Sequence, residues 1–305
     1  MHKIGLTLGP VLFNWDADRL RSFYSGIAEE SKFDRVHLGE VVCGKRTPFT
    51  DAVWPDVIGR LEAAGKQVVL STLAMPATPR ERKSVAELCR DKRLVEVNDV
   101  TALPSRLDAP FVVGPLVNIY NERAAQFLAA RGAVTLCTPV ELPLASVAAI
   151  ARACPNLEIE AFAFGRLPLA LSSRCYHARL HGLHKDSCQF VCAQDPDGLA
   201  VDTIDGQPFL AVNGVQTLSQ GVQAFCPTAD EAASSGIGRL RLSPHATDMV
   251  AVSGIYRDLL DGLIEPAQAR SRLSGLSLPG ALIDGYVRGV AGCAPAAVAC
   301  VMLWG

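Results

Sequence analysis

The stretch QVVLSTLAMPATPRERKSVAELCRDKRLVEVNDV (67–100) decides the fold, because two short runs rich in β-branched residues flank a helix-like segment. The two runs are QVVLSTL (67–73) and LVEVNDV (94–100). A strand, a helix and a second strand in this order are typical of a parallel βαβ unit. The same alternation continues along the chain in both directions.

Eight runs of this kind predict eight strands. They cover residues 3–9, 35–42, 67–73, 94–100, 111–117, 133–140, 157–165 and 238–244. Helix-like segments lie between them, for example at residues 16–30, 121–132 and 143–155. Eight strand–helix repeats fit an α/β fold, the TIM-like (β/α)8 barrel, which takes about 250 residues. The alternative is an open doubly wound sheet.

A long insertion interrupts the alternation between the seventh and eighth strands. Residues 166–237 hold a segment containing Cys and His and a predicted strand pair in IDGQPFLAVNG (204–214). Insertions of this length in a barrel usually carry function. We therefore expect one barrel domain over residues 1–305, with residues 280–305 as a C-terminal tail.

Composition excludes several classes of protein. The 305 residues carry 29 Lys and Arg against 31 Asp and Glu, a net charge of -2, without the basic excess of a general nucleic-acid binder. The first residues lack a signal-peptide pattern, and the apolar run 290–304 is too short for a transmembrane segment. We therefore expect a cytoplasmic protein, whose ten cysteines are metal ligands, catalytic thiols or core residues rather than disulfides.

Three cysteines have the spacing of metal ligands. Cys175, Cys188 and Cys192 lie together in SSRCYHARLHGLHKDSCQFVCAQD (172–195). Iron–sulfur clusters and all-thiolate zinc sites need a fourth ligand. Cys43 follows the second strand, and the carboxyl ends of barrel strands meet at one rim, so Cys43 is the candidate.

The identity of the metal stays open at this point. Zinc is possible, because three histidines are interleaved with the cysteines and could replace a thiolate. They are His177, His181 and His184. Apolar Phe190 and Val191 beside the thiols would keep water from a cluster, which favours iron–sulfur slightly. We expect the other six cysteines to be small packing residues: Cys89, Cys137, Cys154, Cys226, Cys293 and Cys300.

Several motifs resemble the peptidase-like UbiU/UbiV barrel family, in the same order and over most of the chain. They include GEVVCGKR (39–46), EAFAFGRLPLALSSRC (160–175), VNGVQTLS (212–219), RLSPHATD (241–248) and GYVRGVAG (285–292). The UbiV branch is the most similar, because Phe164 precedes Gly165 and Pro168 follows it, where other members usually carry His and Cys. No Ser-His-Asp or HExxH pattern supports a protease.

The resemblance implies a 4Fe-4S cluster held by Cys43, Cys175, Cys188 and Cys192. It also implies a heterodimer with a UbiU-like protein that hydroxylates ubiquinone precursors under anaerobic conditions without molecular oxygen. Two alternatives remain: a metal-stabilised subunit that binds a partner without catalysis, and an RNA hydroxylase, which the charge of -2 disfavours. A cluster with four protein ligands has no open iron, so it suits electron transfer or a structural role.

Substrate contacts would come from the rim of the barrel, where side chains follow the strand ends. Each candidate also fits a capping or hydrogen-bonding role at a strand–helix turn. The candidates are Glu40, Asn98, Asp99, Asn118, Glu141, Arg166 and His245.

Overall fold

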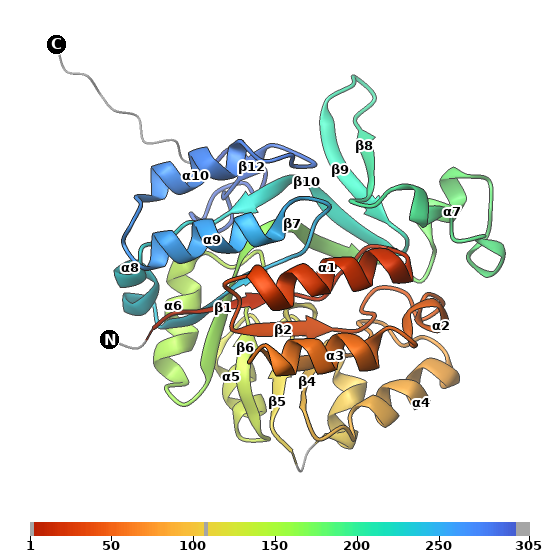
Figure 1. The fold of residues 1–305 in the computed structure, drawn as a ribbon, viewed down its shortest axis with the longest axis horizontal. Coiled ribbons are helices and arrows are strands. Elements are labelled where there is room, and N and C mark those ends of the chain that lie inside the picture. Colours follow the sequence, from red (N-terminus) through yellow and green to blue (C-terminus); the bar gives the residue numbers. More distant parts are fainter. Residues whose placement is uncertain (1–2, 107–108, 297–305) are drawn as a thin grey trace.

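Eight parallel strands form a closed barrel in the computed structural model, which describes residues 3–106 and 109–296 (Figure 1). Neighbouring strands pair in order from β1 to β7, and β11 pairs in parallel with both β7 and β1. The fold is therefore the predicted TIM-like α/β barrel and not an open sheet. The barrel strands are β1 Gly5–Leu8, β2 Arg35–Leu38, β3 Gln67–Ser71, β4 Leu94–Val97, β5 Phe111–Val113, β6 Ala133–Cys137, β7 Glu158–Leu171 and β11 Ile237–Leu242.

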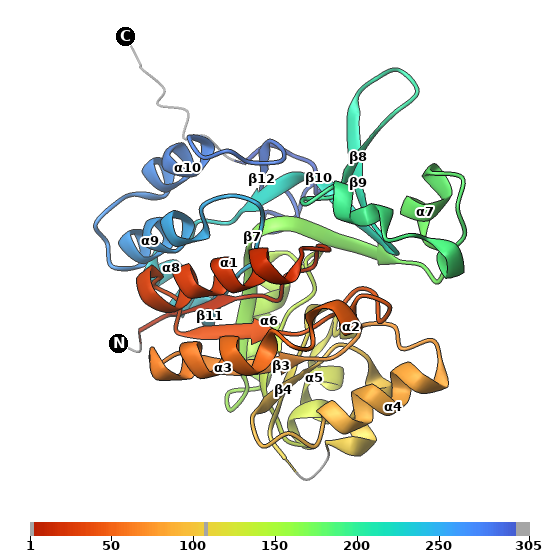
Figure 2. The same ribbon diagram turned by 45° about the vertical axis from the view of Figure 1, so that its right-hand side comes forward.

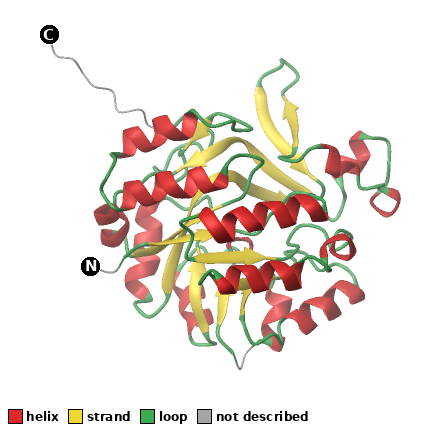
Figure 3. Cartoon of the chain, viewed as in Figure 1, coloured by secondary structure: helices red, strands yellow, loops and turns green. Residues whose placement is uncertain are grey.

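Helices surround the barrel and cover its outer face (Figure 3). Their apolar residues pack on alternate strand residues, as Leu20 and Tyr24 of α1 join Leu6 and Leu8 of β1 in the main core. The helices are α1 Ala17–Glu30, α2 Thr47–Thr50, α3 Trp54–Ala63, α4 Pro79–Leu88, α5 Glu122–Ala129, α6 Leu144–Ala153, α8 Ala229–Ser234, α9 Met249–Leu260 and α10 Pro266–Ser274. Two short 3-10 helices, η1 Val100–Ser105 and η2 Pro115–Val117, follow β4 and β5.

The insertion begins as a continuation of the seventh strand. β7 runs for 14 residues to Leu171, past the end predicted at residue 165, and its last part pairs antiparallel with β10 Gln216–Ala224. β10 pairs with β9 Pro208–Asn213, and β9 with β8 Leu199–Asp202. The insertion also holds α7 Tyr176–Leu180, η3 Lys185–Ser187 and η4 Val191–Gln194. The β8–β9 hairpin and α7 project from the same end of the barrel (Figure 2).

The C-terminal part of the described chain returns to this extended sheet. β12 Leu282–Ile283 pairs with β10. Part of the apolar run 290–304 lies outside the described residues, which end at 296. Within the described ranges, no helix has both the length and the apolar character required to cross a membrane.

Candidate metal centre and barrel rim

The four predicted ligand cysteines line one small cavity at the end of the barrel that carries the insertion. Cys43 lies in the loop after β2 and Cys175 caps the N-terminus of α7, while Cys188 ends η3 and Cys192 lies in η4. Three of them are buried and Cys43 is partly buried. The fold therefore brings together thiols that are far apart in the sequence, from Cys43 to Cys192.

Nitrogen donors point at two of these sulfur atoms. The backbone N–H of Ala178 donates to Cys175 Sγ over 3.4 Å. Cys192 Sγ accepts from Asn14 Nδ2 over 3.5 Å and from Arg46 Nη2 over 3.4 Å. Hydrogen bonds to sulfur stabilise the thiolate form, which is the form that binds metal.

Arg46 places a buried positive charge beside the cavity, with only 1% of its surface exposed. Its guanidinium donates to Leu12 O and Asn213 Oδ1, both over 2.9 Å, and Nη1 lies 3.8 Å from Glu40 Oε1. Burial alone would lower the pKa of Arg46, but Glu40 and the thiol of Cys192 raise it. A buried cation needs nearby anions, and thiolates in the cavity would provide them.

Glu40 shapes the loop that carries Cys43. One carboxylate oxygen accepts the backbone N–H groups of Val42 and Cys43, both over 2.8 Å. Burial raises the pKa of Glu40, whereas Arg46 lowers it in part. The sequence predicts Glu40 as a substrate contact. In the structure its carboxylate instead contacts the loop that carries Cys43.

Two other rim candidates connect loops at the carboxyl end of β4. Asn98 is buried, and its Nδ2 donates to Thr72 O over 3.2 Å and to Glu96 Oε2 over 3.1 Å. Asp99 caps η1 by accepting the backbone N–H of Thr101. Asn98 and Asp99 therefore have the hydrogen-bonding and capping roles that are the alternative to substrate contact.

Arg166 and His245 connect the barrel to the insertion and the C-terminal segment. The buried guanidinium of Arg166 donates to the carbonyl oxygens of Ser219, Gln220 and Pro279 over 2.8, 2.6 and 2.8 Å. The backbone N–H of Arg166 donates to His245 Nε2 over 2.9 Å. His245 Nδ1 lies 3.0 Å from an oxygen of Asp197, so both ring nitrogens of His245 have partners.

These partners give His245 a pH-dependent contribution to stability. Nε2 accepts a hydrogen bond, so the ring is neutral, and burial lowers the pKa of His245 below its usual 6.5. The unfolded chain takes up a proton below about pH 6.5 and the folded chain resists it, so the free energy of unfolding should decrease as the pH falls from 7 to 5.

Urea unfolding at pH 7 and pH 5 measures this effect. The variant His245→Gln should lose less stability over this interval than the wild type. Buried His37, whose pKa is also lowered by burial, acts in the same direction in both proteins. Equal losses in the two proteins would contradict this role of His245.

Asn118 and Glu141 are rim candidates that together line an open cavity of about 270 Å3. Its walls come from the segments that follow β3, β5 and β6 and from the extended part of β7. Asn118 adopts the left-handed conformation at φ 63°. Partial burial and the neighbouring carboxylate of Glu141 raise the pKa of Tyr120.

This rim cavity adjoins the cysteines. Ala74, Leu116 and Leu171 line it, and the same three residues pack in the apolar cluster that contains Cys175 and Cys188. A molecule bound in the rim cavity would therefore be separated from the cysteine cavity by apolar side chains. The two cavities are neighbouring parts of one end of the barrel.

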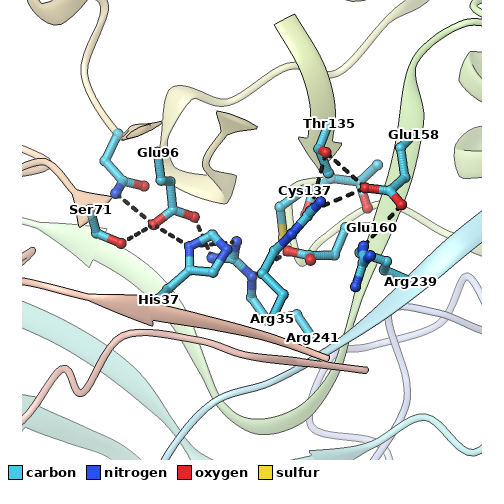
Figure 4. Close-up of polar contacts among 12 residues, drawn as sticks. Arg35, His37, Ser71, Glu96, Thr135, Cys137, Glu158, Glu160, Arg239 and Arg241 are labelled. Carbon is cyan, nitrogen blue, oxygen red and sulfur yellow. Dashed lines mark hydrogen bonds and ion pairs between the residues drawn. The ribbon is translucent and has the colours of Figure 1, made fainter. Parts of the chain in front are cut away.

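A network of buried charges fills the barrel interior and was missed by the sequence analysis (Figure 4). Arg241 reaches both Glu96 and Glu160, with Nε 2.6 Å from Glu160 Oε1. His37 and Ser71 also contact Glu96, over 3.3 and 2.7 Å. Charged residues alternate with apolar ones in RVHL (35–38), LVEV (94–97), LEIE (157–160) and GRLRL (238–242), and this alternation was the available signal.

The carboxylates of this network are ionised despite complete burial. Burial alone would raise the pKa of Glu160, but Arg241 and other neighbouring charges lower it to about 2. The pKa of Glu96 is also well below its usual value, chiefly because of Arg241 acting against burial. The network is enclosed within the barrel, so its charges are compensated within the fold.

The remaining cysteines divide by burial. Cys89, Cys137, Cys154 and Cys226 are buried, as expected of packing residues. Cys293 is exposed, so it does not pack in the core as predicted. Cys300 lies outside the described residues.

The family model for Peptidase family U32 matches residues 24–277. The solved U32 peptidase Mk0906 is 11% identical, with a TM-score of 0.43, and the match covers 81% of this chain and 95% of that one. Thiamine phosphate pyrophosphorylase from Pyrococcus furiosus is 8% identical, with a TM-score of 0.41 and coverages of 87% and 98%. Because the family model spans most of the sequence, this chain belongs to peptidase family U32.

Proposed function

We propose that this chain is the iron–sulfur subunit of a UbiU–UbiV-type complex that hydroxylates ubiquinone precursors without molecular oxygen. The arrangement of Cys43, Cys175, Cys188 and Cys192 around one cavity carries the proposal. Four thiols are the ligand set of a 4Fe-4S cluster. The reaction and the substrate class in this proposal come from the resemblance of the motifs described above to UbiV.

The surroundings of the cavity fit a cluster. Val41, Val42 and Val215 are buried in the same apolar cluster as Cys175, and Phe190 packs against it. An apolar shell excludes water, and N–H groups directed at sulfur influence the reduction potential. A bound cluster would supply one-electron transfer.

The positive charge of Arg46 also suits this ligand set. Four thiolates bring four negative charges into a largely buried cavity, and burial of charge without compensation is costly. Arg46 Nη2 contacts Cys192 Sγ directly. In this proposal the positive charge of Arg46 offsets part of the negative charge of the cluster and its ligands and makes addition of an electron easier.

The rim cavity is the proposed substrate site. Apolar side chains of its lining, such as Met75 and Leu169, could contact an aromatic ring, and Asn118 and Glu141 could orient polar groups on that ring. Its apolar boundary with Cys175 and Cys188 supports an arrangement in which the redox centre lies beside the substrate. Asn118 and Glu141 therefore take the role of substrate-positioning residues.

The insertion is the proposed partner surface. Ile204 and Phe209 of the β8–β9 hairpin are exposed, and so is Leu180 of α7. These side chains lie on elements that project from the barrel (Figure 2). Exposed apolar side chains on projecting elements are typical of protein–protein contact. We assign this surface to the UbiU-like subunit.

Anaerobic copurification with a UbiU-like partner tests the proposal directly. The expected product is a brown complex with about four irons per copy of this chain. Deletion of the gene should abolish ubiquinone in anaerobic cells and leave it unchanged in aerobic cells. A colourless chain with stoichiometric zinc from iron-replete anaerobic cells would rule the proposal out, and so would normal anaerobic ubiquinone in the deletion strain.

Two variants of Arg46 distinguish the effect of its charge on the reduction potential from the effect of its packing. We expect Arg46→Gln to lower the reduction potential of the cluster by about 59 mV or more, a tenfold change in a one-electron equilibrium. Arg46→Lys keeps the charge and should shift the potential less. Redox titration followed by electron paramagnetic resonance measures both, with exposed Arg179→Gln as the control. An unchanged potential in Arg46→Gln would contradict this role.

A further inference from the structure

A second group of metal-binding side chains lies beside the cysteines, in the same insertion. His177 and His181 lie four residues apart, at the start and the C-cap of α7. Asp195 follows η4. One potential ligand atom from each of these three side chains lies within 4.8 Å of the other two.

Within this group, His177 makes the central contacts. The residue is 1% exposed, and its Nε2 lies 2.8 Å from Asp195 Oδ2. The rings of His177 and His181 stack in parallel, with an interplanar angle of 3° and centroids 5.8 Å apart. His181 is exposed, and in the described part of the chain its ring nitrogens form no hydrogen bond. A nitrogen lone pair of His181 is thus available beside a buried imidazole and a carboxylate.

We propose that His177, His181 and Asp195 bind one divalent transition-metal ion, most favourably zinc. Two imidazoles and one carboxylate are a ligand set that zinc accepts, with ligand distances of about 2.0–2.2 Å. Tetrahedral ligands at such distances are about 3.4 Å apart, so side chains already within 4.8 Å need only small movements. Three protein ligands leave a position for water.

This site does not share ligands with the cysteine cavity. His177 lines that cavity, but the three ligands here are nitrogen and oxygen atoms. The proposal therefore holds whether the thiols bind iron, zinc or nothing. His184, the third histidine in the same loop, is outside the group.

The ion would connect two segments that carry candidate cluster ligands. His177 and His181 lie on the helix that Cys175 caps, and Asp195 lies three residues after Cys192. In the described structure, a side-chain hydrogen bond between His177 and Asp195 already joins these two segments. Binding would add His181 to this link and fix α7 against η4.

Zinc titration of the full-length, tag-free chain by calorimetry tests the site, with a matched pair of histidine variants. His181→Ala removes a ligand, whereas His184→Ala removes an exposed histidine from the same loop. Both variants keep all cysteines, so zinc binding by thiols contributes equally to each titration. Because His181 is exposed, its replacement should leave the fold intact.

We expect the wild type and His184→Ala each to bind one more zinc ion than His181→Ala binds. If His181→Ala still binds this ion, its affinity should be at least tenfold lower than that of the other two proteins. Asp195→Asn should weaken binding in the same way, because the amide keeps a polar contact with His177 and loses the charge. Equal stoichiometry and affinity in the wild type, His181→Ala and Asp195→Asn would overturn the proposal. A loss in His184→Ala as large as in His181→Ala would also overturn it.

Discussion

Cys192→Ala is expected to remove most of the iron, from about four atoms per chain to less than about one. Cys192 is the proposed ligand with the most polar contacts, since its sulfur accepts from both Asn14 and Arg46. Its removal deletes one of the four proposed cluster ligands and leaves Arg46 beside the cavity without its sulfur partner. Iron analysis and visible absorbance of anaerobically purified protein measure the loss.

Cys293→Ala is the matched control, because Cys293 is exposed and lies outside the cavity. It should retain the wild-type iron content. A folded Cys192→Ala variant with four irons would show that Cys192 is not a ligand, and circular dichroism of both variants checks that they fold.

Arg241→Met is expected to cause the largest loss of stability, about 3–5 kcal/mol in the free energy of unfolding. Arg241 is the shared partner of Glu96 and Glu160, and all three are almost completely buried. Methionine fills much of the same space but leaves two ionised carboxylates without their main cation. Urea unfolding at pH 7 measures the change.

Two further variants isolate the electrostatic cause. Arg239→Met breaks the ion pair with Glu158, which is partly exposed, so it should cost much less. Adding Glu96→Gln and Glu160→Gln to Arg241→Met removes the unpaired charges and should recover part of the stability. If Arg241→Met and Arg239→Met cost the same, burial of the network would not be the determining factor.

The barrel was predictable because its signal is local. Each strand run, such as residues 67–73, is short, apolar and followed by a helical pattern, and eight repeats leave few possible topologies. Strand ends were less predictable. The run at 157–165 continues as β7 to Leu171, because pairing with β10 supports residues beyond the barrel, and such pairing depends on a segment more than 40 residues away.

The cysteine cavity was predictable for a related reason. Cys175, Cys188 and Cys192 are close in sequence, and the rule that strand ends share one rim was enough to add Cys43. The contacts of the surrounding side chains were not predictable. Arg46 reaches Cys192 and Asn213 only after the insertion folds back on the barrel. His245 likewise meets Asp197 across the end of the barrel, so neither contact has a sequence signal.

Closure of the barrel between β1 and β11 has a consequence for synthesis of the protein. Residues 5–8 pair with residues 239–242. During translation the first strand therefore lacks this partner until more than 200 further residues have been synthesised. Until then, one edge of the nascent sheet has unpaired backbone groups, which is a known hazard for association with other chains. The carboxylates of Glu96 and Glu160 within the unfinished sheet would oppose such association and favour its own late strand, which brings Arg241.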